Sequence, residues 1–276
     1  MNTLIAYGGM MKLLKKSFKH YNLIKYIMSK SYGGGRLGNQ IIRNLAVSII
    51  ASKYNLSVDY SSKDLINKLG IELYNGSNVY EITQYLTDNN YFNVYNCGNI
   101  NYNLDSNSAF FQTKDITNFL YDYLHTDSVK SNIIEKNPFK ERYNTNNDLF
   151  IHIRLTDVEH YNPGLNYYLN AIKSITFDNL YISTDDKTHN IINNIFQIYP
   201  NAKLIEYDEI NTFQFASTSK NILLSHGSFS AVIGYLAFYS TIYYPEYDIN
   251  HMWYGDMFSI NNWIKCKYLI WFYSNW

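Results

Sequence analysis

The second half of the chain alternates between apolar segments of strand length and amphipathic segments of helix length. Between residues 149 and 240 this alternation predicts four strands, each followed by a helix. The expected strands are 149–154, 179–184, 202–206 and 221–225, and the expected helices are 165–175, 187–199, 211–220 and 229–240. Helices between successive strands are typical of a parallel sheet covered on both faces, so we expect an α/β fold.

The first half begins with a similar unit and continues less regularly. A glycine-rich turn over 31–40 precedes an amphipathic helix over 41–54, and 55–60 then has the pattern of a short strand. The remaining expected elements are helices at 62–70 and 115–135, short strands near 92–96 and 109–112, and a polar linker at 144–148.

These patterns divide the chain into two lobes. Residues 31–143 form an N-terminal α/β lobe, and residues 148–276 form a C-terminal Rossmann-like lobe. Its aromatic tail, Trp263–Trp276, is expected to pack back on the body. Residues 1–30 are expected to form a basic leader or a packed helix.

Composition limits the classes of partner. The chain has 276 residues, and its 23 Lys and Arg balance its 23 Asp and Glu, so no overall field attracts nucleic acid. The two cysteines, Cys97 and Cys266, are far apart and have no metal-ligand spacing, so we expect no metal. No signal peptide or transmembrane anchor is evident, which predicts a cytoplasmic protein with at most a peripheral N-terminal helix on a membrane.

The segment 151–157, IHIRLTD, carries the clearest functional signal. It ends a buried strand with His152, Arg154 and Asp157, and ligands of open α/β sheets bind at such strand ends. The guanidinium of arginine matches the oxygens of a phosphate bidentately, so the segment points to an anionic, nucleotide-like ligand. The alternative is a surface pair between Arg154 and Asp157.

A glycine pattern precedes the first long helix. Gly33-x-Gly35-x-x-Gly38 matches a dinucleotide fingerprint, and Asp59 follows at the distance expected of a ribose-binding acid. The preceding residues 28–32 have a poor strand pattern, and polar residues follow Gly38, which counts against that interpretation. The glycines still allow backbone N–H groups to approach a phosphate at the start of the helix. The alternative is a simple glycine turn.

Two further segments lie at expected strand ends. In Ser183-Thr184-Asp185-Asp186, the acids can accept hydrogen bonds from a base or ribose, bind a metal, or cap the next helix. Residues 225–230, SHGSFS, place hydroxyls and N–H groups at a helix start, which suits a phosphate or simply a capped helix. Together with Arg154, these segments predict a nucleoside diphosphate bound between two lobes.

Four segments, taken in order, resemble the motifs of a known family. They are Gly35-Arg36-Leu37-Gly38-Asn39-Gln40, His152-x-Arg154-x-x-Asp157, Tyr181-Ile-Ser-Thr-Asp-Asp186 and Leu224-Ser225-x-x-Ser228-Phe229-Ser230. The set resembles the α1,2-fucosyltransferase family within the wider GDP-fucose-dependent superfamily. The first segment also looks like its protein O-fucosyltransferase version.

The resemblance implies a GT-B-like fold, with two Rossmann-like lobes whose parallel sheets face a central cleft. It implies metal-independent, inverting transfer of fucose from GDP-fucose to a glycan or glycoprotein acceptor, with no cofactor. The N-terminal lobe is then the acceptor side. By position, the implied catalytic residues are Arg154, Asp157 and Asn39. The implied nucleotide-sugar-binding residues are Gly35, Arg36, Gly38, Asn39, His152, Arg154, Asp185, Asp186, Ser228, Phe229 and Ser230, and the acceptor candidates are Glu159 and His160.

The sequence departs from this family at two positions, and other classes stay open. Leu155 stands where the family has a second Arg, and protein O-fucosyltransferases likewise have an aliphatic residue there. Thr156 replaces a common Gly. The alternatives are a transferase for another nucleotide sugar, an NAD(P)-dependent oxidoreductase built on Gly33–Gly38 and Asp59, and a non-catalytic glycan- or nucleotide-binding protein. Nicotinamide binding and product formation separate these classes.

Overall fold

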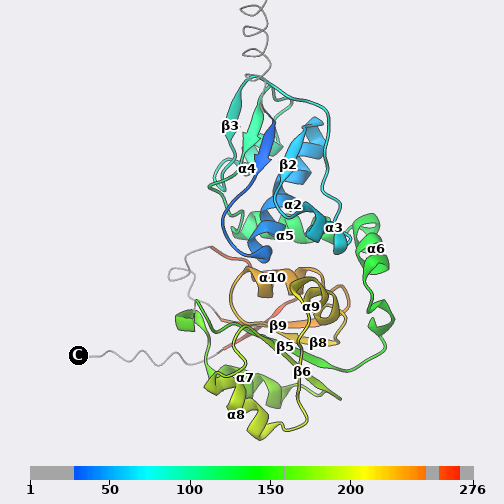
Figure 1. The fold of residues 1–276 in the computed structure, drawn as a ribbon, viewed down its shortest axis with the longest axis vertical. Helices are drawn as coiled ribbons and strands as arrows, with labels where there is room; N and C mark the ends of the chain where they lie inside the picture. Colours follow the sequence, from blue (N-terminus) through cyan, green and yellow to red (C-terminus); the bar gives the residue numbers. More distant parts are fainter. Residues whose placement is uncertain (1–27, 158, 247–254, 268–276) are drawn as a thin grey trace, which may run out of the picture.

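A computed structural model describes residues 28–157, 159–246 and 255–267 of the chain. These residues form two stacked lobes, each built on its own parallel sheet (Figure 1). The α/β class expected from the sequence is therefore confirmed. The expected leader 1–30 and the C-terminal tail lie largely outside the described residues.

The N-terminal lobe contains a four-stranded sheet in the order β2-β1-β4-β3. All of its strand pairs are parallel. Helices α2 and α5 lie between this sheet and the second lobe (Figure 1). Its elements are β1 Ser29–Ser31, α2 Leu37–Tyr54, β2 Val58–Tyr60, α3 Lys63–Lys68, β3 Thr83–Tyr85, α4 Tyr91–Tyr95, β4 Asn103–Asp105 and α5 Lys114–Leu124.

Helix α6 (Asp127–Lys136) and the 3-10 turn η1 (Lys140–Arg142) lead into the second lobe. The C-terminal lobe has a six-stranded parallel sheet in the order β10-β9-β8-β5-β6-β7. Its elements are β5 Leu149–Ile153, η2 Glu159–Tyr161, α7 Leu165–Ser174, β6 Leu180–Thr184, α8 Asn190–Ile198, β7 Lys203–Leu204, α9 Glu209–Ala216, β8 Asn221–Leu223, α10 Ser228–Tyr235, β9 Thr241–Pro245 and β10 Ile264–Cys266.

Strand β5 lies inside the C-terminal sheet and is buried along its whole length. Leu149, Ile151 and Ile153 belong to a core cluster that includes residues of α7 and α8. Because side chains alternate along a strand, Phe150 lies on the other face, in the cluster that includes residues of α9 and α10. His152 shares that second face, which is the face turned toward the N-terminal lobe.

The two lobes pack through α2 and α10. One hydrophobic cluster runs from α2 and α5 into α9 and α10. A Cβ atom placed on Gly38 of α2 would lie 2.6 Å from the backbone nitrogen of Phe229 in α10, so only glycine allows this approach. Helices, and not an empty space, therefore fill most of the region between the two sheets.

Several sequence-based expectations for the first half were wrong. Residues 91–95 form helix α4, 109–112 form no strand, and strands β3 and β4 were missed. Tyr91 explains α4, because its buried ring packs against Phe111 and its hydroxyl donates to Ala46 O at 3.0 Å. Tertiary packing here overrides the strand preference of aromatic residues.

The segment 28–32 was expected to be a poor strand, but it contains β1, an inner strand of its sheet. Its serines are buried and hydrogen-bonded: Ser31 Oγ donates to Asn44 Oδ1 at 2.6 Å, and Ser29 Oγ accepts from Leu104 N. These polar side chains replace the hydrophobic pattern that normally marks a buried strand. Strand β9 and the tail strand β10 were also missed. None of the helices in the described ranges has the length and hydropathy needed to cross a bilayer.

Candidate functional site

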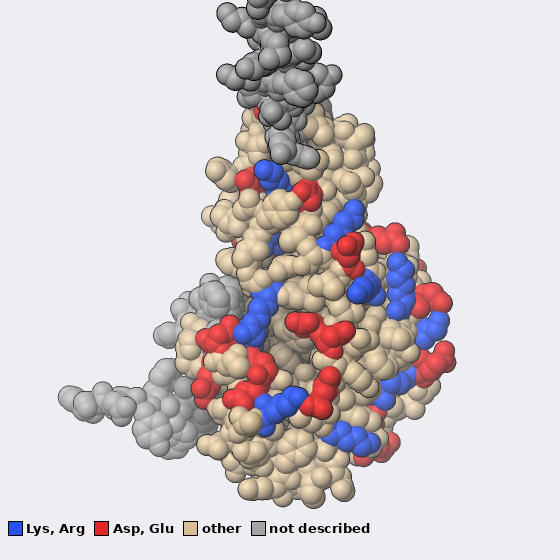
Figure 2. All heavy atoms as spheres, viewed as in Figure 1, with Lys and Arg blue, Asp and Glu red and all other residues tan. Residues whose placement is uncertain are grey.

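A cavity of about 330 Å³ lies where the C-terminal ends of β5 and β6 meet the first turns of α2, α9 and α10. Acidic and basic side chains gather around a hollow between the lobes on this face (Figure 2). The cavity is lined by Arg36, Leu37, His152, Arg154, Ser183, Thr184, Asp185, Tyr207, Asp208, Glu209, Thr212 and Phe229. The chain has only four arginines, and two of them line this cavity.

Arg154 follows β5 directly, and the surrounding loops hold it in place. Its backbone N–H donates to Ser225 Oγ at 3.4 Å, and its carbonyl accepts from Asn162 Nδ2 at 2.8 Å. The side chain is only 13% exposed and contacts Asp157 Oδ1 through NH2 at 2.7 Å. Its Nε is buried and has no hydrogen-bond partner among the described residues. A buried donor without a partner is unfavourable, so Arg154 is suited to bind a further acceptor.

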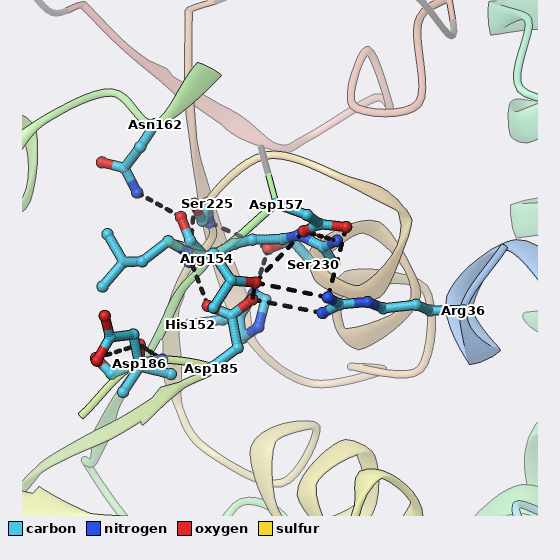
Figure 3. A network of polar contacts seen from close by, with 12 residues as sticks. Arg36, His152, Arg154, Asp157, Asn162, Asp185, Asp186, Ser225 and Ser230 are labelled. Atoms are coloured by element: carbon cyan, nitrogen blue, oxygen red, sulfur yellow. Dashed lines mark hydrogen bonds and ion pairs between the residues drawn. The ribbon is translucent and has the colours of Figure 1, made fainter. Parts of the chain in front are cut away.

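Arg36 reaches across from the N-terminal lobe (Figure 3). Its guanidinium lies 3.4 Å from both Asp157 Oδ2 and Asp185 Oδ2, and its side chain is 55% exposed. Such long, exposed ion pairs contribute little to stability. Arg36 is therefore free to exchange these carboxylates for another anion.

The carboxylate of Asp185 is held by the loop after β5. It accepts from Leu155 N at 2.7 Å and from Thr156 Oγ1 at 2.6 Å. Burial raises the pKa of Asp185, but these hydrogen bonds and the charge of Arg154 outweigh it and lower the pKa below its ordinary value. Asp185 thus stays ionised and fixes the loop that carries Arg154.

Asp157 is paired with both arginines. Partial burial raises the pKa of Asp157. The hydrogen bond from Arg154 and the charges of Arg154 and Arg36 outweigh this effect, so the pKa lies below its ordinary value. A carboxylate with a lowered pKa is a weak general base. The geometry agrees with the alternative raised from the sequence, in which Asp157 is a partner for Arg154.

His152 lines the cavity from strand β5, and its side chain is buried. Its Nδ1 lies 2.6 Å from Ser230 Oγ, which also accepts from Ser225 N at 3.2 Å. A serine hydroxyl can donate one hydrogen bond and accept two, so its contact with His152 Nδ1 fits either tautomer of the neutral ring. Burial lowers the pKa of His152 to about 3, so the ring is neutral near pH 7.

This burial predicts an acid-sensitive fold. Below pH 6.5 the unfolded chain protonates His152, whereas the folded chain resists protonation down to about pH 3. The free energy of unfolding should therefore fall on acidification through this window, by up to about 1.4 kcal/mol per pH unit. Denaturant unfolding of wild type and His152→Asn at pH 7, 6 and 5 measures it. An equal acid dependence in the two proteins would contradict the assignment.

Helices α2 and α10 point uncapped N-termini at this region. No side chain caps either helix, and Gly227 before α10 has a φ of 88°, which favours glycine. The N-terminus of a helix carries a partial positive charge and free N–H groups. Ser228 and Phe229 begin α10, and Phe229 stacks on Phe213 with its ring centroid 4.1 Å away. The two arginines and the two helix ends together suit an anionic group.

Three sequence-predicted residues serve the structure around the cavity. Gly38 packs against α10, as described above. Asn39 does not line the cavity, and its Oδ1 accepts from Gln112 Nε2 at 2.8 Å. Asp186 is also outside the cavity lining, and its Oδ1 accepts from Thr188 N at 2.9 Å. This bond and one from the Thr188 hydroxyl lower the pKa of Asp186, so the acid stabilises the turn before α8.

The acceptor candidates lie on η2, beside the cavity but not in its lining. Glu159 Oε1 is 2.8 Å from His189 Nε2, which ties η2 to the start of α8. His160 packs on Tyr161 with ring centroids 4.0 Å apart. These contacts position the loop but do not assign it a ligand.

Strand β1 precedes the dinucleotide pattern, although the sequence predicted a poor strand there. The glycines of this pattern and Asp59 nevertheless contact other residues of the N-terminal lobe. A Cβ on Gly33 would collide with the guanidinium of buried Arg43, and one on Gly35 with the side chain of Asn39. Asp59 accepts a hydrogen bond from the hydroxyl of Tyr32. Packing explains these glycines and this acid without a bound dinucleotide.

Sequence reasoning missed the cavity wall formed by the start of α9. Tyr207, Asp208 and Glu209 line it, as does Thr212 one turn later. Asp208 caps α9 by accepting from Asn211 N at 2.7 Å. An acid at a helix start after a strand was the available signal, but only the tertiary fold brings this helix to β5 and β6.

The chain is thus an α/β protein with two parallel sheets. Its cavity lies between the two lobes and contains groups that suit an anionic ligand. No protein-family model matches the sequence, and a search of curated proteins found no match. In the described ranges, no group of three or more His, Cys, Asp or Glu side chains is arranged to hold a metal ion.

Proposed function

We propose that the chain is an inverting glycosyltransferase that uses a nucleoside diphosphate sugar, with GDP-fucose as the first candidate donor. The observation that carries this proposal is the convergence of Arg36 and Arg154, from different lobes, beside the uncapped start of α10. Arginine forks and helix N-termini are both groups that bind phosphate oxygens.

In the proposed complex, the diphosphate lies against Arg154 and the first N–H groups of α10. Arg154 offers its Nε, which has no partner among the described residues, and a guanidinium that is largely buried. The phosphate also attracts Arg36 away from Asp157 and Asp185, because those contacts are long and exposed. The donor then joins the two lobes through its phosphates.

Transfer forms a bond between an acceptor hydroxyl and the anomeric carbon of the donor. The bond from that carbon to the β-phosphate oxygen breaks, and its electron pair leaves with the nucleoside diphosphate. Arg154 and the α10 N-terminus stabilise the charge that develops on this leaving group. The proposal assigns this charge stabilisation to the protein and needs no metal ion.

The proton of the acceptor hydroxyl passes to Asp157 or to solvent. The arginine contacts hold the pKa of Asp157 below its ordinary value, so it is a weak base in the free protein. Movement of Arg36 to the phosphate removes one of these contacts. The pKa of Asp157 then rises, which makes it a stronger base in the complex than in the free protein.

A thermal-shift panel tests the proposal. The purified protein is heated with GDP, UDP, CDP, dTDP, NAD⁺ and GDP-fucose, with and without EDTA. At a hundredfold excess over its dissociation constant, a ligand stabilises by about 2.7 kcal/mol, which is readily measured. We expect a shift with GDP and GDP-fucose that survives EDTA. A shift with another nucleotide alone changes the donor, and a shift with NAD⁺ alone contradicts the proposal.

Leu155 favours a second candidate, a non-catalytic nucleotide-binding protein. Its side chain is buried in the core cluster on the α7 and α8 side of the sheet. Leu155 replaces the second arginine of the family motif, so the motif has one cation fewer, although this side chain does not line the cavity. Release of GDP from GDP-fucose separates the two candidates, since a binding protein gives none.

A further inference from the structure

The start of α9 forms a wall of the cavity that the proposed phosphate contacts leave unused. This wall consists of Tyr207, Asp208 and Glu209. The carboxylate of Asp208 is occupied as the cap of α9. Glu209 is exposed, and its carboxylate has no hydrogen bond or ion pair to any described residue. Glu209 is therefore the acceptor on this wall that remains open to a ligand.

Tyr207 gives the wall an aromatic surface. Its ring packs against Phe139 and Phe215, with centroids 5.5 and 5.6 Å away, and these contacts fix its orientation. The residue is still 47% exposed, so much of its surface remains open where it lines the cavity. A fixed and accessible aromatic ring is suited to stack on a planar base.

His152 offers a ligand in this cavity a further polar contact. Its side chain lines the cavity although the residue is only 6% exposed. Ser230 occupies its Nδ1. Nε2 is not among the fully buried atoms that lack a partner, so a polar group of a ligand in the cavity can reach it.

We propose that the α9 wall reads the donor's base and selects guanine, with Tyr207 stacking on the ring and Glu209 accepting its two neighbouring N–H donors. Guanine presents N1–H and the N2 amino group side by side, which matches the two oxygens of one carboxylate. Adenine, uracil and cytosine do not offer this pair of donors. The inference rests on the proposed function and assigns the base specificity of the same site.

Calorimetric titration of wild type and Glu209→Gln with GDP and IDP tests this inference. IDP lacks the N2 amino group and so loses one of the two contacts. We expect wild type to bind GDP at least about tenfold more tightly than IDP, because hydrogen bonds to a charged group are strong. In Glu209→Gln, GDP binding should weaken by about tenfold or more, and the preference over IDP should shrink toward one.

Three comparisons make the result decisive. Glu206→Gln removes a nearby exposed carboxylate that pairs with Lys187 and does not line the cavity, so GDP binding should be unchanged. Tyr207→Leu should weaken GDP and IDP binding equally. Titration with 2′-deoxy-GDP tests whether Glu209 reads the ribose instead of the base.

The outcomes separate the two proposals. An unchanged ratio of GDP to IDP affinity in Glu209→Gln would overturn the assignment of the base while leaving the proposed function intact. If the variant instead loses its preference for GDP over 2′-deoxy-GDP, Glu209 reads the ribose and the assignment is wrong. If wild type binds no nucleoside diphosphate, the proposed function fails and this inference fails with it.

Discussion

Replacing Arg154 with alanine should reduce the rate of GDP release from GDP-fucose by about a hundredfold to a thousandfold, the loss typical when a group stabilising transition-state charge is removed. Of the two arginines at the cavity, Arg154 is the more buried, and its Nε has no hydrogen-bond partner among the described residues. Steady-state assay of GDP release, with and without candidate acceptors, measures the effect.

Two further variants make the Arg154 result specific. Arg154→Lys keeps the charge but loses the planar fork, so its rate should fall between those of wild type and Arg154→Ala. Lys140→Ala removes a charge from an exposed pair with Glu135, outside the cavity lining, and should release GDP at the wild-type rate. Full activity in a folded Arg154→Ala protein would rule out the proposed role.

Gly38→Ala should lower the free energy of unfolding by about 3 kcal/mol, because overpacking of a tight contact typically costs 1–3 kcal/mol or more. The added methyl would meet the backbone of Ser228 and Phe229 at 2.6 to 2.9 Å, and neither helix backbone can move freely. The displacement would also shift the start of α10, so GDP affinity should fall as well. Denaturant unfolding and GDP titration measure the two effects.

Gly34→Ala is the matched control for this substitution. A Cβ on Gly34 meets no atom within 4 Å, and its backbone is not in the left-handed region. Its free energy of unfolding should stay within about 0.5 kcal/mol of wild type, as for most surface substitutions. If the two alanine variants are equally stable, α2 and α10 do not pack as described.

The sequence was sufficient for the part of the C-terminal lobe from β5 to α10, where the central strands β5 and β8 are fully buried, but not for β9 and β10. Residues 149–153 form an apolar run interrupted only by His152, which predicts a buried strand. Helices α7 and α8 have clear amphipathic patterns, which predict helices. The N-terminal lobe gave weaker signals. Strand β1 is stabilised by buried serine hydrogen bonds, and α4 by the packing of Tyr91, and neither leaves a pattern in its own segment.

The candidate site was predicted where a motif and a strand end coincide. Arg154, His152 and Asp185 follow or end neighbouring strands, so parallel topology brings them to one edge. Asn39 and Asp186 belong to the predicted motifs but do not line the cavity. Asn39 accepts a hydrogen bond from Gln112, and Asp186 stabilises the turn before α8. Glu209 comes from a helix whose position depends on the order of strands, which no local pattern encodes.

Calorimetric titration of the wild-type protein and Arg154→Ala with GDP, in buffer containing EDTA, is the direct test of the proposed diphosphate site. We expect one binding site in wild type that EDTA does not remove, and a loss of affinity of at least about tenfold in a folded Arg154→Ala protein. Absence of GDP binding by wild type, or equal affinity in the two proteins, would contradict it.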